Sequence, residues 1–396
     1  MTVTHSGIEL GGQLVPHMMP PSIDPIRVLH VIQNLNYGGM ERLLADIVRG
    51  LDRSRFEAHV LVLQYFGRFA DGLQEVAQLH QAPRMSRWSM LRPTALARQV
   101  ASIAPHVVHT HSGVWYKASL AARMAGVRRI IHTEHGRQSP DPLAYRAIDS
   151  LAARRTDIVV AVSEPLRQQL IATRVAPARR MCVVQNGVDT NLYCPRPDDG
   201  ALRREIGVDE HVPIIGSIGR LERIKGYDVM IDAFARLLST WTDGPKPVLV
   251  LAGEGSQREQ IEKMICERGI ASHVRLLGWR NDAQALYAGF TLFTMSSRSE
   301  GTSVSLLEAM SAGLCPVVTD VGGNANVLGA ELAHRLTPSE DPDALGAAWR
   351  QALRDRGALV ADGAAARARV LREFSISAMI HEYERLYATD TGGAVH

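Results

Sequence analysis

Short apolar runs alternate with segments of helical spacing along most of the chain. Apolar residues recur every three or four positions in 40–51 and 95–103, which predicts helices there. Because runs of strand type alternate with such helices, we expect parallel sheets with helices on both faces. The predicted strands cover 27–32, 58–63, 107–109, 129–133, 157–163, 181–184, 213–219, 248–253, 274–278, 291–294 and 316–319.

The strands fall into two series, separated by a segment rich in proline and acidic residues at 194–200. Such a composition is typical of a linker, and a chain of 396 residues suits two domains. Both series predict a doubly wound, Rossmann-like α/β domain. The predicted division is a flexible leader at 1–24, a first domain at 25–194, a linker at 195–205 and a second domain at 206–373.

The stretch from 298 to 322 predicts a turn, a helix and a strand. Small and polar residues precede an apolar helical pattern that ends at Gly313. The unpaired amides of such a helix start attract phosphate. Glu300 lies beside this start and Glu308 about two turns further on, where carboxylates can accept hydrogen bonds from sugar hydroxyls. The alternative is an ordinary αβ unit with two solvated glutamates.

Two further elements suit an anionic ligand. Arg220 and Lys225 follow the first strand of the second domain, at a sheet edge where they would neutralise a diphosphate. In a structural interpretation they would instead cap a helix or pair with Glu222. Gly38 and Gly39 lie between a strand and a helix, where glycine lets the backbone approach a ligand, although most such turns merely connect elements.

His135 lies just beyond the predicted strand 129–133, where ligands of open α/β sheets bind, although a histidine in that position is often structural. His109, His111 and His132 suggest a metal cluster with it. No adjacent pair of carboxylates completes such a cluster, so no metal is predicted.

Other patterns narrow the function. Residues 253–255 lack the full G-x-G-x-x-G fingerprint and a suitably spaced acid, which disfavours a dehydrogenase. Asp341 and Asp343 resemble a metal-binding D-x-D motif, but they precede a helical pattern at 344–353 and are expected to cap it. The four cysteines show no C-x-x-C spacing, so neither a disulfide framework nor a zinc site is indicated.

Charge is distributed unevenly along the chain. Residues 1–190 carry 22 lysines and arginines against 14 acids, and the remainder carries 22 against 27. A basic first half suits an anionic membrane, a phosphorylated lipid or nucleic acid, and a solvated basic face explains it equally. No segment approaches the ~20 apolar residues of a membrane helix, and residues 1–24 lack the pattern of a secretory signal. We therefore expect a cytoplasmic protein.

Several ordered motifs together resemble the retaining GT-B glycosyltransferases of family 4. The resemblance covers roughly residues 26–388. Its motifs are G-G-M-E-R at 38–42, H-T-E-H-G at 132–136, V-S-E at 162–164, N-G-V-D at 186–189, G-R-L-E-R-I-K-G at 219–226, L-A-G-E-G at 251–255, L-L-G at 276–278 and E-x7-E at 300–308.

The resemblance implies two Rossmann-like domains that face each other across a cleft, with a last helix at 374–390 crossing back to the first. It also implies the catalytic residues His135, Arg220, Lys225 and Glu300. Arg220 and Lys225 would hold the diphosphate of a nucleotide-sugar, Glu300 would contact the transferred sugar, and His135 would lie near that sugar. The implied donor-binding set is completed by Gly38 and Gly39 near the phosphate, Thr302, Ser303 and Val304 at the helix start, Glu308 at the ribose and Gly278 near the base.

The expected activity is transfer of a sugar from a UDP- or GDP-sugar to a hydroxyl of a glycan or lipid-linked acceptor, with retention and without a metal or other cofactor. The setting would be exopolysaccharide or cell-envelope glycan synthesis, with contact to the anionic inner face of the cytoplasmic membrane and no nucleic acid partner. The family commonly has a proline-glutamate pair where this chain has Asn324-Ala325-Asn326. Because of this departure, an alternative function stays open: a catalytically weak protein that binds a nucleotide-sugar as a partner in a polysaccharide assembly complex. A nucleotide-sugar epimerase of the same fold is a further alternative.

Overall fold

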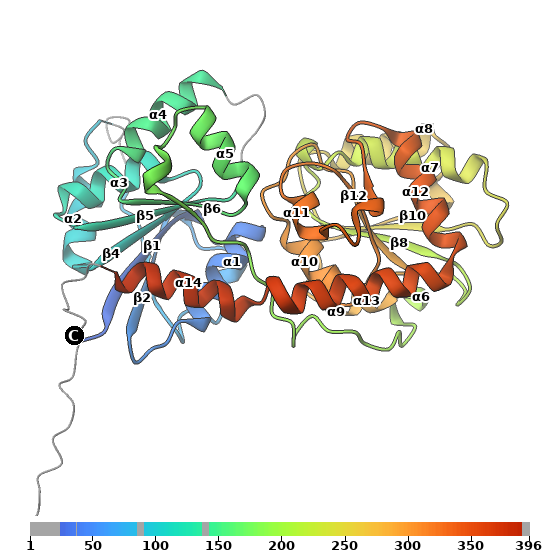
Figure 1. Cartoon of the computed structure of the whole chain (residues 1–396), viewed down its shortest axis with the longest axis horizontal. Helices are drawn as coiled ribbons and strands as arrows, with labels where there is room; N and C mark the ends of the chain where they lie inside the picture. The colour runs from blue at the N-terminus through green and yellow to red at the C-terminus, as the bar shows by residue number, and fades with distance from the viewer. Residues whose placement is uncertain (1–23, 37, 85–90, 137–141, 390–396) are drawn as a thin grey trace, which may run out of the picture.

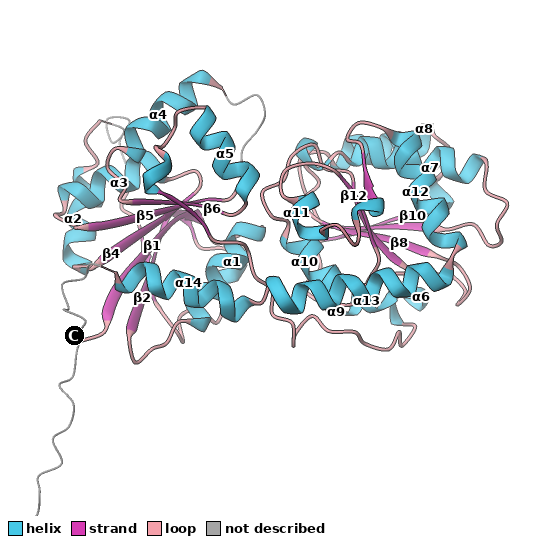
Figure 2. Cartoon of the chain, in the orientation of Figure 1, coloured by secondary structure: helices cyan, strands magenta, loops and turns pink. Residues whose placement is uncertain are grey.

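The computed structural model describes residues 24–36, 38–84, 91–136 and 142–389. Within these ranges the chain forms two α/β domains side by side, each with helices on both faces of a parallel sheet (Figures 1 and 2). The predicted fold class is thereby confirmed. The predicted leader lies, except for Asp24, outside the described residues.

The sheet of the first domain has the strand order β3-β2-β1-β4-β5-β6-β7, and all neighbouring strands pair in parallel. Its elements are β1 (Ile26–Asn34), α1 (Gly39–Gly50), β2 (Phe56–Tyr65), β3 (Gln78–Gln81), α2 (Thr94–Ile103), β4 (Val107–His111), α3 (Trp115–Met124), β5 (Arg129–Glu134), α4 (Leu143–Ala153), β6 (Ile158–Ala161), α5 (Glu164–Ala172) and β7 (Met181–Val183).

The sheet of the second domain has the order β10-β9-β8-β11-β12-β13 and is also parallel. Its elements are α6 (Ala201–Ile206), β8 (Ile214–Ile218), α7 (Tyr227–Ser239), β9 (Val248–Ala252), α8 (Arg258–Glu267), β10 (Val274–Gly278), α9 (Ala283–Gly289), β11 (Leu292–Met295), α10 (Val304–Ser311), β12 (Pro316–Thr319), α11 (Asn324–Leu328), β13 (Leu336–Thr337), α12 (Pro342–Arg354) and α13 (Arg356–Glu373).

A last helix, α14 (Ile376–Ala388), returns to the first domain, where it packs against α1 and β1 (Figure 1). Met379, Tyr383 and Tyr387 are buried in that domain's core. Ser375 begins the helix by accepting a hydrogen bond from the amide of Ala378, as an N-cap residue should. The crossing expected from the family resemblance is therefore present.

The chain enters the second domain earlier than the composition predicts. Val188 and Tyr193 are already buried in the second domain's core, and α6 begins inside the predicted linker at 195–205. Leu202 and Ile206 anchor this helix in the same core. Proline and acidic residues thus mark a surface segment here, although the boundary of the packed domain lies upstream of it.

The topology predicts a ligand site at the carboxyl ends of the central strands in each sheet. In the first sheet β1 lies between β2 and β4, and in the second β8 lies between β9 and β11. Strand order reverses at both points, and ligands of doubly wound sheets bind outside the carboxyl ends of the strands there. Within the described residues, no helix has both the length and the apolar content to cross a bilayer.

Candidate active site

A cleft of about 1000 Å³ separates the two domains and is lined by residues from both. Most of the sequence-predicted site residues line it. These are Gly38, Gly39, His135, Arg220, Lys225, Glu300, Thr302, Ser303, Val304 and Glu308. Gly278 does not line the cleft, but it ends β10 with a φ of 69°, and the next residues, Trp279 and Arg280, do line it.

Two helix starts meet in the cleft. A Cβ atom built on Gly39, the first residue of α1, would lie 3.5 Å from Cγ2 of Val304, the first residue of α10. Ser303 caps α10 by accepting a hydrogen bond from the amide of Leu306 at 3.4 Å. The remaining first-turn amides have no partner within their helices. Because both helices direct their positive ends here, this part of the cleft favours an anion.

The predicted cations lie beside these helix starts, and one of them is paired. Nζ of Lys225 lies 2.6 Å from Oε1 of Glu300, which also accepts a hydrogen bond from the hydroxyl of Ser297 at 2.6 Å. Arg220 is exposed in the cleft. Glu222 is occupied elsewhere, because it accepts hydrogen bonds from the amide and hydroxyl of Ser256. Lys225 therefore pairs with a carboxylate of the cleft and not with Glu222.

Glu41 is a half-buried carboxylate between the cleft residues Met40 and Arg42, and the sequence motifs assign it no role. Its Oε2 lies 2.2 Å from where a Cβ atom on Gly38 would be, so a larger residue at 38 would displace it. Burial raises the pKa of Glu41, while its backbone hydrogen bond and nearby Arg220 lower it. An acid thus lies close enough to the arginine predicted to bind phosphate for the two charges to interact.

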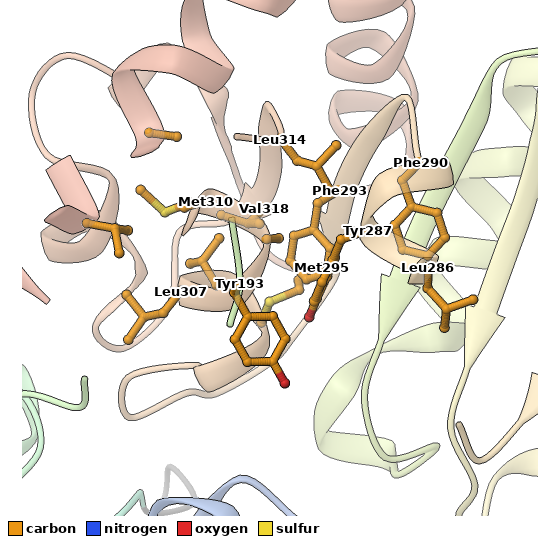
Figure 3. Close-up of a cluster of buried hydrophobic side chains, with 14 of the residues drawn as sticks. Tyr193, Leu286, Tyr287, Phe290, Phe293, Met295, Leu307, Met310, Leu314 and Val318 are labelled. Carbon is orange, nitrogen blue, oxygen red and sulfur yellow. The ribbon is translucent and has the colours of Figure 1, made fainter. Parts of the chain in front are cut away.

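Glu308 lies at the bottom of the cleft and is almost inaccessible. The hydroxyl of Tyr287 donates a hydrogen bond to its Oε2 at 2.9 Å. Burial raises the pKa of Glu308, against the influence of Arg42 and the hydroxyls of Tyr287 and Tyr193. In Figure 3 the hydroxyls of Tyr193 and Tyr287 point to the same side of the buried cluster of the second domain.

Arg42 and Tyr193 are site residues to which the sequence analysis gave no role. The guanidinium of Arg42 lies 5.7 Å from the centre of the Tyr193 ring, and its Nε donates to Oδ2 of Asp46 at 3.1 Å. Both residues line the cleft. Arg42 stands inside the G-G-M-E-R motif and Tyr193 follows N-G-V-D, so the motifs mark these places, but no spacing indicates that the two side chains meet.

Residues 300–302 connect the second domain to the first across the cleft. A Cβ atom on Gly301 would lie 2.1 Å from the backbone oxygen of His135, so only glycine permits this approach. The hydroxyl of Thr302 donates to the backbone oxygen of Val162 at 2.6 Å, and Nδ2 of Asn186 donates to the backbone oxygen of Thr302 at 2.8 Å. His135 and Glu300 are thereby held next to each other by contacts of Gly301 and Thr302, the residues that follow Glu300.

Gly322 and Gly323, which precede the segment Asn324-Ala325-Asn326, pack against the backbone of residues 300 and 301. Gly322 has a φ of 55°, and a Cβ atom there would lie 1.8 Å from the backbone oxygen of Glu300. The amide of Gly323 donates to the backbone oxygen of Gly301 at 2.9 Å. Asn324, which follows, is fully buried and donates from Nδ2 to the backbone oxygen of Thr319. The turn is thus formed although the proline-glutamate pair is replaced.

The histidines of the first domain are grouped differently from the sequence expectation. His30, His109 and His111 have ring nitrogens within 4.8 Å of one another and are fully buried. Both ring nitrogens of His109 lie 2.7 Å from hydroxyls, those of Tyr387 and Thr133. We assign no metal to this group, and the prediction of a metal-free protein stays a prediction. Asp341 does cap α12, because it accepts a hydrogen bond from the amide of Ala344.

Comparison with known proteins places both domains in recognised sequence families. Residues 37–192 match the model described as glycosyltransferase family 4, and residues 198–369 match that of glycosyl transferases group 1. The chain is 25% identical over 313 residues to the UDP-Gal:alpha-D-GlcNAc-diphosphoundecaprenol alpha-1,3-galactosyltransferase of Escherichia coli, covering 76% of this chain and 80% of that protein. It is 29% identical over 356 residues to the GDP-mannose-dependent alpha-(1-6)-phosphatidylinositol monomannoside mannosyltransferase of Mycobacterium tuberculosis, covering 83% and 89% respectively.

Solved structures resemble the whole described architecture. The crystal structure of Anabaena Alr3699/HepE in complex with UDP-glucose aligns with a TM-score of 0.78 at 22% identity, over 91% of this chain and 98% of that one. A glycosyltransferase from Rickettsia africae aligns with a TM-score of 0.79 at 17% identity, over 94% of this chain and all of that one. At these identities the likeness establishes the fold.

Proposed function

Because the chain belongs to the family 4, group 1 type glycosyltransferases of the GT-B fold, we propose that its donor is a UDP- or GDP-sugar and its acceptor a hydroxyl group. Relatives named for UDP-galactose and GDP-mannose, and a structural neighbour solved with UDP-glucose, support this class of donor. The donor lies in the cleft between the domains, and the sugar passes to a glycan or lipid-linked acceptor.

One observation carries the proposal: the starts of α1 and α10 meet beside Arg220 and Lys225 in a single cleft. When the bond at the anomeric carbon breaks, negative charge develops on the diphosphate. Fixed amides and cations already directed at that charge stabilise the transition state without rearranging. These groups supply the positive charge themselves, so we propose a reaction that needs no metal.

We further propose that the anomeric configuration is retained by attack on the same face from which the diphosphate departs. The carboxylate of Glu300 is bound by Lys225 and Ser297. A carboxylate neutralised in this way is a poor nucleophile, which favours same-face attack over a covalent sugar–enzyme intermediate. Glu300 instead orients the sugar, and the contacts of residues 301–302 with the first domain help to exclude water.

For the acceptor, we propose a lipid-linked glycan reached at the anionic inner face of the cytoplasmic membrane, in exopolysaccharide or cell-envelope glycan synthesis. The basic balance of residues 1–190 supports such a partner. Helix α4 adds an exposed apolar surface in the same domain, because Leu143 and Tyr145 are 75% and 64% exposed.

The proposal is tested by a thermal-shift screen against UDP, GDP and their sugars, followed by turnover with the stabilising donor. A ligand that binds only the folded state raises the apparent stability. We expect release of nucleoside diphosphate that depends on a lipid-diphosphate sugar acceptor, persists in EDTA and gives a product with the donor's anomeric configuration. Isomerisation of donor without acceptor would instead indicate an epimerase. Saturable donor binding without turnover, even with extracts that contain native acceptors, would indicate a binding partner.

A further inference from the structure

Three histidine rings form a line from the core of the first domain to the cleft. His30 lies on β1, His111 ends β4, and His135 directly follows β5. Nδ1 of His30 lies 3.4 Å from Nε2 of His111, and Nδ1 of His111 lies 3.1 Å from Nε2 of His135. His30 and His111 are fully buried, whereas His135 lines the cleft.

All three rings are neutral near pH 7. Burial lowers the pKa of His30 to about 3 and that of His135 to about 4, and it holds the pKa of His111 well below its ordinary value. A neutral imidazole carries one N–H and one bare nitrogen. In each contact between two rings, one nitrogen carries a proton and the other is bare. Because each ring has a single proton, the tautomer of one ring determines the tautomers of the other two.

The surroundings of Nε2 of His30 determine which ring donates and which accepts in each contact of the line. Within the described part of the chain, Nε2 of His30 is buried and has no hydrogen-bond partner. A proton there would leave a buried N–H unpaired, and such groups are rare in proteins because a buried donor without an acceptor loses the hydrogen bond it would make to water. The proton of His30 therefore belongs on Nδ1, from which it is donated to Nε2 of His111.

The proton positions on His111 and His135 follow from that on His30. His111 accepts on Nε2, so its own proton lies on Nδ1 and is donated to Nε2 of His135. His135 accepts on Nε2, and its proton must lie on Nδ1. His109 does not interfere, because its two nitrogens are taken by the hydroxyls of Tyr387 and Thr133, which can rotate to suit either tautomer.

We infer that His30 and His111 are positioning residues that hold His135 as its Nδ1–H tautomer, so that this ring offers the cleft a hydrogen-bond donor. The identity of the accepting group rests on the proposed function: it is an oxygen of the transferred sugar or of the diphosphate. A neutral donor suits a hydroxyl oxygen, because it orients that oxygen without adding a charge to the sugar.

The tautomer can be read directly from the ligand-free protein. Two-bond proton–nitrogen NMR correlations of the histidine-labelled full chain distinguish Nδ1–H from Nε2–H rings, and the His135→Gln variant assigns the signal. We expect the Nδ1–H pattern for His135 at pH 7.5. An Nε2–H pattern would overturn the inference even where glycosyl transfer is measured. Because no substrate is present, a failure of the proposed function would leave this result unchanged.

Two substitutions at His111 separate positioning from mere packing. His111→Leu removes the proton donor, so we expect Nε2–H rings to appear at His135 and kcat/KM for the donor sugar to fall roughly 10-fold, the size of one hydrogen bond. His111→Asn places an amide N–H near the position of Nδ1. We expect this variant to restore most of the Nδ1–H pattern of His135 and most of kcat/KM. An unchanged His135 pattern in a folded His111→Leu protein would overturn the inference.

A matched control exists near one edge of the same sheet. Nδ1 of His59 lies 2.9 Å from Nε2 of His80, on β2 and β3, and neither residue lines the cleft. His80→Leu removes an imidazole–imidazole contact of the same kind. We expect it to leave the His135 tautomer and the turnover unchanged, and a change of either equal to that in His111→Leu would count against the inference.

Discussion

Lys225 is the residue on which the proposed charge stabilisation depends most directly. It stands on the short helical turn Arg223–Lys225 after β8 and binds Glu300 at 2.6 Å, so its ammonium group is already directed into the cleft. We expect Lys225→Ala to lower kcat roughly 100-fold, because one preorganised donor to a developing anion is worth about that much. Steady-state kinetics with varied donor would measure it.

Lys263→Ala provides the control for this experiment, because Lys263 is 74% exposed on α8 and does not line the cleft. It should retain normal kinetics. If Lys225→Ala kept both its rate and its donor KM, the phosphate role of this lysine would be wrong.

Glu308 is predicted to act on binding more than on the chemical step. Its carboxylate is buried, accepts a hydrogen bond from Tyr287 and faces Arg42, so it can orient a ribose hydroxyl. Glu308→Gln keeps the size of the side chain but removes its charge. We expect the donor KM to rise about 10-fold with a smaller change in kcat, as for an interaction made equally in ground and transition states.

Tyr287→Phe is the companion variant, since it removes a hydroxyl but leaves the carboxylate. It should cost about 1 kcal/mol of stability, the usual size of one hydrogen bond, with a smaller effect on donor KM. A donor titration by calorimetry in which Glu308→Gln binds as tightly as the wild type would remove Glu308 from the nucleotide site.

The strands that carry the histidines make stability depend on pH. Burial lowers the pKa of His30 to about 3 and of His135 to about 4, and those of His109 and His111 well below 6.5. Below pH 6.5 the unfolded chain binds protons that the folded chain does not. The contribution of these histidines to the free energy of unfolding should therefore be fully present above pH 6.5. It should fall by about 1 kcal/mol per histidine for each pH unit below that value.

Urea denaturation between pH 7.5 and 5 would measure this loss. The other ionisable groups that face the rings include Tyr383 and Tyr387 of α14 and two residues of β5. Of these two, His132 lowers the pKa of His109, His111 and His135 further, whereas Glu134 opposes the effect at His135. The range stops at pH 5, because the raised pKa of buried Glu308 acts in the opposite direction. His30→Asn should flatten the dependence by about one proton, because asparagine binds no proton in either state.

The turn at Gly322 makes an element-level prediction with a close control. Gly322 and Gly207 both have left-handed φ angles, 55° and 68°, so alanine costs about 1 kcal/mol of backbone strain at either. Only at Gly322 would the new Cβ collide with the backbone of Glu300, since nothing lies within 4 Å at Gly207. Gly322→Ala should therefore lose most turnover and Gly207→Ala only stability. Equal activity of the two folded variants would contradict this.

Apolar runs predicted the buried strands well because both faces of a parallel sheet are covered. They predicted the edge strands β7 and β10 but missed the other two edge strands, β3 and β13. β3 has the sequence Gln78-Leu79-His80-Gln81 with its ends exposed, and β13 is only two residues long, so neither produces an apolar run. Helix α13 was missed as well, since its alanines and arginines give a weak helical pattern and only Gly363, Ala366 and Val370 are buried.

The candidate site shows the same division between local and distant information. Glycine turns and helix starts depend on residues adjacent in the sequence, so the sequence alone could assign Gly39, Ser303 and Lys225 to the site. The contact of Arg42 with Tyr193 joins residues 151 positions apart in the chain, and the line from His30 to His135 depends on strand register. No local pattern encodes such contacts, because they arise only when the sheets are assembled.

At the scale of the whole molecule, the chain passes between the domains at two adjacent points. The amide of Val188 donates to the backbone oxygen of Phe374 at 2.9 Å, and the amide of Ile376 donates to that of Val188 at 3.0 Å. Helices α13 and α14 run in series along one side of both domains (Figure 1). The first domain contains α4 and belongs to the half of the chain with an excess of basic residues, while the second supplies Arg220, Lys225 and both site glutamates.

The proposed membrane contact of the first domain would leave the cleft accessible, since Leu143 and Tyr145 do not line it. Helix α4 exposes Leu143, Tyr145 and Leu151, and exposed arginines follow at Arg154 and Arg174. Apolar side chains enter the headgroup region and arginines attract anionic lipid, each at about 1 kcal/mol near the surface. We expect the full chain to sediment with phosphatidylglycerol vesicles more than with phosphatidylcholine vesicles, and less so as salt is raised.

The double variant Leu143→Asp with Tyr145→Asp should abolish most of this binding, because it replaces the apolar contact and adds like charge. It should leave turnover of a water-soluble acceptor analogue unchanged, since neither residue lines the cleft. Val360→Asp, at a residue 69% exposed on α13 of the second domain, is the matched control and should still bind. Equal sedimentation with both lipids, or loss of binding in Val360→Asp alone, would mean that the membrane is met by another surface or not at all.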